Sequence, residues 1–223
     1  MNGGSYYLFW FLAPMLLSLW ARHPALLIIV LLALAGRRWL PDPYLFFKYG
    51  GRIRSLRIDI AANPDNVVAR RELAAIYLEK RRPRAALTLI EEALARDAAA
   101  PELIYLHGRA LLGARRYEQA VERLLAAVAL EPKLAYGEPL LKAGDALARL
   151  GRLAEAEDAY ARVVHINRST VEARCKLGLV RAARKEPEGA KAAFADARDT
   201  FRQLPTFQRR KQWWWALRAW AAA

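Results

Sequence analysis

Residues 119–132 read QAVERLLAAVALEP, and three further segments follow the same pattern: AALTLIEEALARDA (85–98), EAEDAYARVVHINR (155–168) and GAKAAFADARDTFR (189–202). Each has a small residue in second position, a large apolar residue four positions later, and a small residue or valine three after that. The second-position residues are Ala86, Ala120, Ala156 and Ala190, at spacings of 34, 36 and 34. Self-similarity at such a period is typical of a protein built from stacked repeats.

A second pattern precedes each of these segments. Twelve residues before the marked alanines stand Ala74, Gly108, Gly144 and Gly178. Two antiparallel helices explain both patterns, because small residues let the helices approach closely while the large residue fills the space between neighbouring units. The pattern therefore predicts an all-α chain of helix pairs.

The pattern resembles that of the tetratricopeptide repeat (TPR) family. The second unit carries the family's diagnostic residues in order: Gly108, Tyr117, Ala120, Leu124, Ala127 and Pro132. The family's early tryptophan is absent, the closing proline is missing from the other three units, and two residues are inserted at about 133–136. The resemblance implies an α-solenoid with a concave groove.

The repeats and their flanks divide the chain into four parts. We expect a membrane anchor at 1–40, a basic linker and N-terminal capping helix at 41–66, four TPR units at 67–204, and a Trp-rich basic capping helix at 205–223. The units run over about 67–100, 101–134, 137–170 and 171–204. Within the linker, RIRSLRIDIAANP (52–64) resembles the second helix of a degenerate fifth unit.

The resemblance implies a protein partner, because TPR proteins mostly hold a peptide or helix in their groove. Residues of the first helix of each pair should line it: Arg71, Ala75, Tyr105, Arg109, Leu112, Lys142, Asp145, Arg149, Cys175 and Leu179. No asparagine occupies these positions, so the specificity of the TPR class that clamps a chaperone's C-terminal carboxylate does not carry over. The mixture of basic and apolar residues favours a ligand with acidic and hydrophobic side chains.

The first forty residues contain two apolar stretches, SYYLFWFLAPMLLSLWA (5–21) and PALLIIVLLALAG (24–36). One helix over both would run roughly 48 Å, beyond a hydrocarbon core of roughly 30 Å. A hairpin of two short transmembrane helices fits better, and the alternative is one tilted span with an interfacial segment. A signal peptide is disfavoured, because the start of the chain lacks a basic region and Arg-His-Pro interrupts the apolar stretch.

The distribution of basic residues predicts the orientation of the anchor. Arg37, Arg38 and further basic residues follow the second stretch, whereas the turn holds Arg22 alone. By the positive-inside rule the repeats face the cytoplasm, at a bacterial inner membrane. Arg37, Arg38 and Trp39 should lie at the membrane interface.

The net charge of +14 is concentrated at the two ends of the chain. Residues 1–60 hold seven basic and two acidic side chains, residues 201–223 five and none, and the remainder 24 and 20. Basic ends beside apolar segments favour an anionic lipid bilayer as a partner. Nucleic acid is the second candidate and is not expected, because the repeats contribute little of the excess charge.

The chain closes on RRKQWWWALRAW (209–220), in which three consecutive tryptophans cover most of a helix circumference. One face, with Trp213, Leu217 and Trp220, is expected to pack on the fourth repeat. The other side chains are then left for the bilayer, for the chain's own anchor or for another subunit. These are Arg210, Lys211, Trp214, Trp215 and Arg218.

Enzyme chemistry is not indicated. The sequence has no phosphate-binding glycine loop and no His-Glu-x-x-His motif, and its single cysteine, Cys175, excludes an internal disulfide and a cysteine-based zinc site. We expect no catalytic residue, cofactor or metal. The leading hypothesis is a membrane-anchored scaffold or adaptor for assembly or recruitment of a membrane complex. Its alternatives are a structural subunit of such a complex and a nucleic-acid-binding protein at the membrane, and the oligomeric state stays open.

Overall fold

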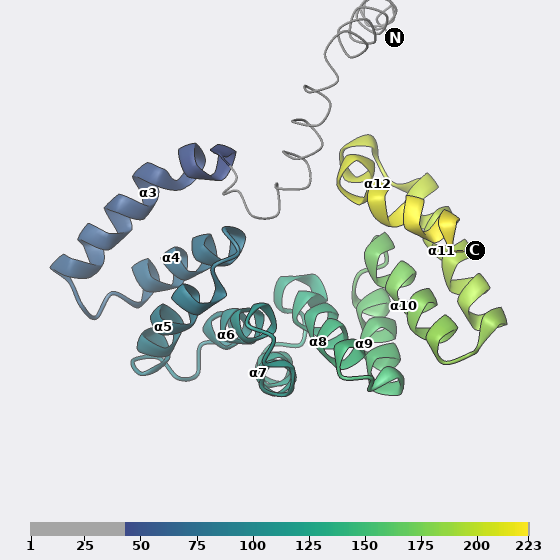
Figure 1. The fold of residues 1–223 in the computed structure, drawn as a ribbon, viewed down its shortest axis with the longest axis horizontal. Coiled ribbons are helices and arrows are strands. Elements are labelled where there is room, and N and C mark those ends of the chain that lie inside the picture. Colours follow the sequence, from purple (N-terminus) through teal and green to yellow (C-terminus); the bar gives the residue numbers. More distant parts are fainter. Residues whose placement is uncertain (1–42, 223) are drawn as a thin grey trace, which may run out of the picture. The chain divides into compact units, whose positions relative to one another are not determined.

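The computed structural model describes residues 43–222, which form ten α-helices, one short 3-10 helix and no strand (Figure 1). Helix α3 (Pro43–Ala62) comes first. Four antiparallel pairs follow: α4 (Val67–Glu79) with α5 (Pro83–Leu94), α6 (Pro101–Gly113) with α7 (Tyr117–Leu130), α8 (Glu138–Arg149) with α9 (Leu153–Ile166), and α10 (Val171–Ala183) with α11 (Pro187–Gln203). Helix α12 (Thr206–Ala221) closes the chain. The prediction of an all-helical solenoid is confirmed for these residues.

The predicted anchor at 1–40 lies outside the described residues, as do Arg37, Arg38 and Trp39. Across 43–222, no helix combines the length and the apolar character needed to cross a membrane. Arg52–Ala223 form one compact unit, which contains the four helix pairs and α12.

The second, third and fourth pairs are each held together by a contact between a glycine of the first helix and a large residue of the second. A Cβ added to Gly108 would lie 2.6 Å from Cγ of Leu124, and one added to Gly144 or Gly178 would lie 2.6 Å from the ring of Tyr160 or Phe194. These distances are too short for any real side chain, so glycine is what allows the large residue to enter. The prediction that small residues let the two helices approach closely is confirmed. The large residue enters its own pair, whereas the sequence-based prediction placed it between neighbouring units.

The turn inside each pair contains one residue in the left-handed conformation. Its occupants are Arg81 (φ 54°), Arg115 (φ 64°), Gly151 (φ 76°) and Lys185 (φ 63°). Only glycine adopts this conformation without strain. Three of the four turns therefore keep a long basic side chain at a position that favours glycine.

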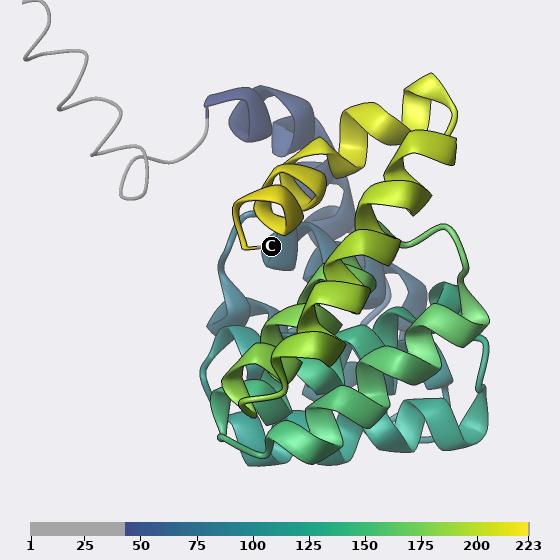
Figure 2. The same ribbon diagram turned by 90° about the vertical axis from the view of Figure 1, so that its right-hand side faces the viewer.

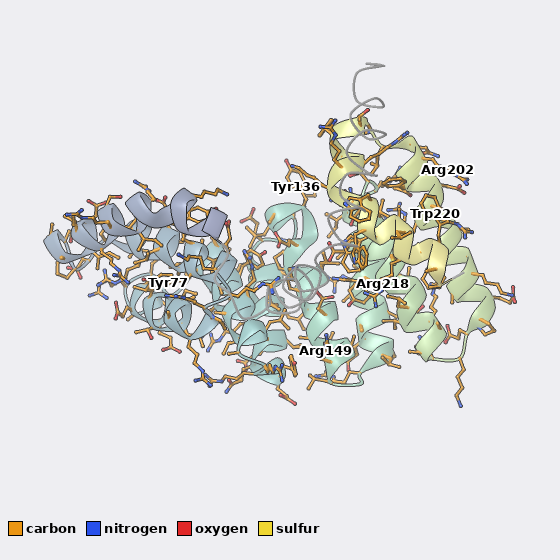
Figure 3. The ribbon with its side chains drawn as sticks, turned by 45° about the horizontal axis from the view of Figure 1, so that its top comes forward. Tyr77, Tyr136, Arg149, Arg202, Arg218 and Trp220 are labelled. Atoms are coloured by element: carbon orange, nitrogen blue, oxygen red, sulfur yellow. The ribbon has the colours of Figure 1, made fainter. Side chains whose placement is uncertain are left out.

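The insertion before the third pair forms the 3-10 helix η1 (Leu134–Gly137). Ala135, Tyr136 and Gly137 all have positive φ, and the Tyr136 side chain is exposed (Figure 3). The extra residues are thus absorbed locally, and the following helix pair keeps its packing.

Candidate functional site

Within Arg52–Ala223, the first helices of the pairs lie on one side of the stack and the second helices on the other (Figure 1). Helix α4 contacts α6, and α6 contacts α8. We call the surface of α4, α6, α8 and α10 the inner surface. All ten residues predicted for the groove lie on these helices, namely Arg71 and Ala75 on α4, Tyr105, Arg109 and Leu112 on α6, Lys142, Asp145 and Arg149 on α8, and Cys175 and Leu179 on α10.

Four predicted groove residues are cations without a carboxylate partner. Arg71, Arg109, Lys142 and Arg149 form no ion pair within 4.0 Å among the described residues. Arg149 is exposed at the end of α8 (Figure 3), and the other three are half-buried. Half-buried cations without partners have a surplus capacity to bind acidic groups.

Neighbouring arginines on the same helices are bonded inside the fold. Arg70, beside Arg71 on α4, donates to Glu92 on α5 at 2.8 Å. Arg174 on α10 donates to Asp196 on α11 at 2.7 Å. These arginines join the two helices of a pair and are not available to a partner.

Tyr105 is more deeply buried than the prediction requires. Its side chain is 7% exposed, and its buried hydroxyl has no hydrogen-bond partner among the described residues. Burial raises the pKa of Tyr105, so the phenol stays protonated. The Arg109 guanidinium lies 5.5 Å from the ring centre. Tyr105 therefore belongs to the core beneath Arg109, with Glu138 also near its hydroxyl.

Asp145 is not a free ligand residue, because the fold already uses its carboxylate. It accepts from the Tyr160 hydroxyl at 2.8 Å and forms an ion pair with Lys176 at 2.7 Å. Lys176 also bonds Glu172 at 2.6 Å and lies 5.0 Å from the centre of the Trp215 ring. This network joins α8, α9, α10 and α12. Lys176 was not predicted from the sequence, although its i,i+4 spacing from Glu172 was an available signal.

Cys175 does not line an accessible surface. It is fully buried in a cluster with Phe194, Ala216 and Ala219, and burial raises the pKa of its thiol. Leu179 packs partly against the same cluster. The expectation that Cys175 contacts a partner is wrong, because α12 covers this part of α10.

Helix α12 docks through small residues. Ala216 and Ala219 are fully buried, and Trp215 beside them is half-buried. The Gln212 side chain accepts the Val171 backbone N–H at 2.7 Å and donates to the Ser169 carbonyl at 3.2 Å. Figure 2 shows α12 folding back after α11. The helix thus caps the fourth pair, as the sequence predicts.

The predicted packing face of α12 is wrong. Trp213, Leu217 and Trp220 are 54%, 44% and 47% exposed. Trp220 keeps one edge contact with Phe201, at 6.1 Å between ring centres. Alanine lets the helix axes approach more closely than tryptophan would, so the larger side chains are left outside.

The exposed part of α12 combines indoles with positive charge. Trp213 and Trp214 meet edge to face at 5.7 Å, and Trp214 is 55% exposed. Arg210, Lys211 and Arg218 lie on the same helix, which has no acidic residue. Figure 3 shows Arg218 near Trp220 on this helix. This surface is suited to an anionic and partly apolar partner.

No family model matches the chain, and no curated protein matches its sequence. Solved structures are similar to it in fold. The crystal structure of MamA is 23% identical, with a TM-score of 0.64 over 68% of this chain and 88% of that one. MamA from Desulfovibrio magneticus RS-1 is 18% identical, with a TM-score of 0.64 over 69% and 86%. YrrB, described as "a TPR protein with an unusual peptide-binding site", is 21% identical, with a TM-score of 0.56 over 66% and 78%. The helix pairs of this chain therefore have the tetratricopeptide repeat fold.

Proposed function

We propose that the chain is a scaffold or adaptor that binds an acidic, partly apolar segment of a partner protein along α4, α6 and α8. One observation carries the proposal: the inner surface holds four cations without intramolecular partners among the described residues, Arg71, Arg109, Lys142 and Arg149. YrrB, which has the same fold and is described as having a peptide-binding site, supports it.

The chemistry of the inner surface suits such a segment. Carboxylates of the partner would pair with the cations, and partial burial strengthens those pairs by excluding water. Ala75 and Leu112 lie on the same helices as these cations, are both half-buried, and offer apolar contacts to the partner.

Reversing two of these charges should release the partner. We expect Arg109→Glu/Arg149→Glu to lower the yield of crosslinked partner from membranes at least tenfold, since each lost charge-assisted bond is worth about 1.5–3 kcal/mol. Arg162→Glu is the matched control, because Arg162 lies on the second helix α9 with its side chain 52% exposed. Thermal unfolding should confirm that both variants fold. Retention of every partner by the double variant would show that the inner surface is not the site.

We further propose that residues 1–40 anchor the chain in a bacterial inner membrane, with the repeats in the cytoplasm. The apolar stretches and the basic residues after them support this proposal. The exposed indoles and cations of α12 would then lie against the anionic bilayer. If the chain is instead a structural subunit, they meet another protein, and a nucleic-acid-binding protein would stack bases on them.

Cysteine labelling tests the orientation and the role of α12 together. Trp214→Cys and Ala192→Cys place a thiol at two exposed positions of α12 and α11, while the native Cys175 is buried and gives little background. A membrane-impermeant maleimide should label neither in intact spheroplasts. After lysis, Trp214→Cys should react about tenfold more slowly than Ala192→Cys. A bilayer contact that stabilises the covered state of the thiol by about 1.4 kcal/mol lowers its accessible population, and hence its reaction rate, about tenfold.

Each departure from this result has its own meaning. Labelling of Ala192→Cys before lysis would place the repeats outside the cytoplasm. Equal rates after lysis would remove α12 from the bilayer. Protection of Trp214→Cys that survives dissolution of the lipid by mild detergent would favour a neighbouring subunit.

A further inference from the structure

The turns of the first two helix pairs line a strongly basic cavity that is open to solvent. Its volume is about 510 Å³, and its lining residues come from the α4–α5 turn and from the end of α6. Arg81, Arg82, Arg84 and Arg115 line it, together with small and apolar residues and no carboxylate. We call these four residues the arginine cradle. All four are exposed, and none forms an ion pair among the described residues.

A close approach of the two turns creates the cradle. A Cβ added to Gly113 would lie 3.0 Å from Cβ of Pro83, so the second turn comes almost into contact with the first. Arg81 and Arg115, one repeat period apart in the sequence, thereby line the same cavity. The four guanidinium groups repel one another, and no carboxylate lining the cavity offsets that repulsion.

The backbone of the cradle is also strained. Arg81 and Arg115 have φ of 54° and 64°, in the left-handed region that costs a residue with a Cβ about 1–2 kcal/mol. The third pair places Gly151 at the same position of its turn. The fourth pair keeps Lys185 there with φ 63°, so the left-handed residue belongs to the turn, and what distinguishes the first two pairs is the gathering of arginines.

The arginines at and beside the equivalent turns of the third and fourth pairs are bonded inside the fold. Glu155 accepts two hydrogen bonds from Arg152, at 2.7 and 2.6 Å. Glu157 binds both Arg181 and Arg184. Arginines at or beside the turns of the third and fourth pairs therefore have carboxylate partners. Among the described residues, the four arginines of the cradle have none.

We propose that the arginine cradle binds a phosphate group, carried either by an anionic lipid headgroup or by a soluble polyphosphate. Guanidinium groups bind phosphate oxygens in pairs of parallel hydrogen bonds, and they remain charged at every physiological pH. One carboxylate satisfies two arginines at Glu157, so four arginines around one cavity call for an anion with more charge and more oxygens. The cradle is formed by the pair turns and not by the inner surface, so this inference does not depend on the proposed partner site.

Glycine substitutions test the cradle without threatening the fold. Arg81→Gly/Arg115→Gly removes two positive charges and relieves two left-handed residues, so the variant should be at least as stable as the wild type. Lys185→Gly is the matched control, because Lys185 has φ 63° in the equivalent turn of the fourth pair and does not line the cavity. Arg84→Glu is a second variant, since the second and fourth pairs carry Glu118 and Glu188 at that place in their helices.

The full chain in neutral detergent is titrated with two probes, inorganic tripolyphosphate and short-chain phosphatidylglycerol. We expect Arg81→Gly/Arg115→Gly and Arg84→Glu to bind the preferred probe at least tenfold more weakly than the wild type, while Lys185→Gly binds it within about twofold. Tighter binding of phosphatidylglycerol identifies a lipid headgroup as the source of the phosphate, and tighter binding of tripolyphosphate identifies a soluble anion.

Three results would overturn the proposal. The first is binding of neither probe to the wild type. The second is an equal loss of binding in Lys185→Gly and in the cradle variants. The third is equally tight binding of poly-glutamate or of a single-stranded oligonucleotide, which would show that the cradle does not select a small phosphate group.

Discussion

Replacement of Phe194 by alanine should lower the free energy of unfolding by about 4 kcal/mol, within the range for a large core residue. The Phe194 ring is 2% exposed and packs against Gly178 at the centre of the fourth pair. Val171, Cys175 and Ala197 complete the cluster around it. Urea unfolding followed by circular dichroism measures the loss. A loss below about 1 kcal/mol would mean that the ring is not packed as described.

The contact with Gly178 allows a sharper version of this test. Gly178→Ala should cost about 1–3 kcal/mol, because its Cβ would lie 2.6 Å from the Phe194 ring. The first pair uses Ala74 and Ile90 at the same two positions, and both are fully buried. Gly178→Ala/Phe194→Ile reproduces that solution, so it should be more stable than the sum of its single changes predicts, by about 1 kcal/mol or more.

A glycine without neighbours provides the control. A Cβ at Gly51, in helix α3, would meet nothing within 4 Å. Gly51→Ala should therefore leave stability unchanged or raise it by up to about 1 kcal/mol, through helix propensity alone. If the changes in unfolding free energy of Gly178→Ala and Phe194→Ile simply add in the double variant, the contact between these two residues is contradicted.

These residues were predictable because the repeat presents the same contact several times. The repeat relates Gly108 to Gly178 and Leu124 to Phe194, across two periods of 34 residues plus the two inserted residues, and the helix pair brings each small residue against its large partner. Residues 67–203 could be assigned to helix pairs in this way. The cradle was within reach of the same reasoning, since Arg81 and Arg115 are also one period apart, but the cavity between them depends on how closely the turns approach.

The end of the inner surface could not be predicted in the same way. Helix α12 occurs once, so no repeat reveals which of its faces is buried. The sequence-based prediction places the largest side chains in the contact, whereas Ala216 and Ala219 form it. That difference covers Cys175 and brings Trp215 against Lys176. Asp145 is unavailable for a separate reason, since its carboxylate already binds Tyr160 and Lys176.

A charge placed in the α12 contact should expose Cys175. In the wild type the thiol is fully buried and its pKa is raised by burial, so it should react slowly with a thiol reagent. Ala216→Arg puts an unpaired guanidinium at a fully buried position, which costs several kcal/mol unless the helix moves away. A loss of about 2.7 kcal/mol in docking raises the open population, and hence the reaction rate, about 100-fold.

The matched control is Ala221→Arg, which makes the same substitution on an exposed position of α12 and should leave the rate within about twofold. Circular dichroism separates the two ways in which the thiol can become accessible, because undocking of α12 keeps the helices whereas unfolding of the fourth pair loses them. Fast reaction with the helical signal retained would show that α12 is a separate layer over α10. A rate in Ala216→Arg equal to that of the wild type would mean that α12 does not cover Cys175, and the inner surface would then extend along α10 as the sequence predicted.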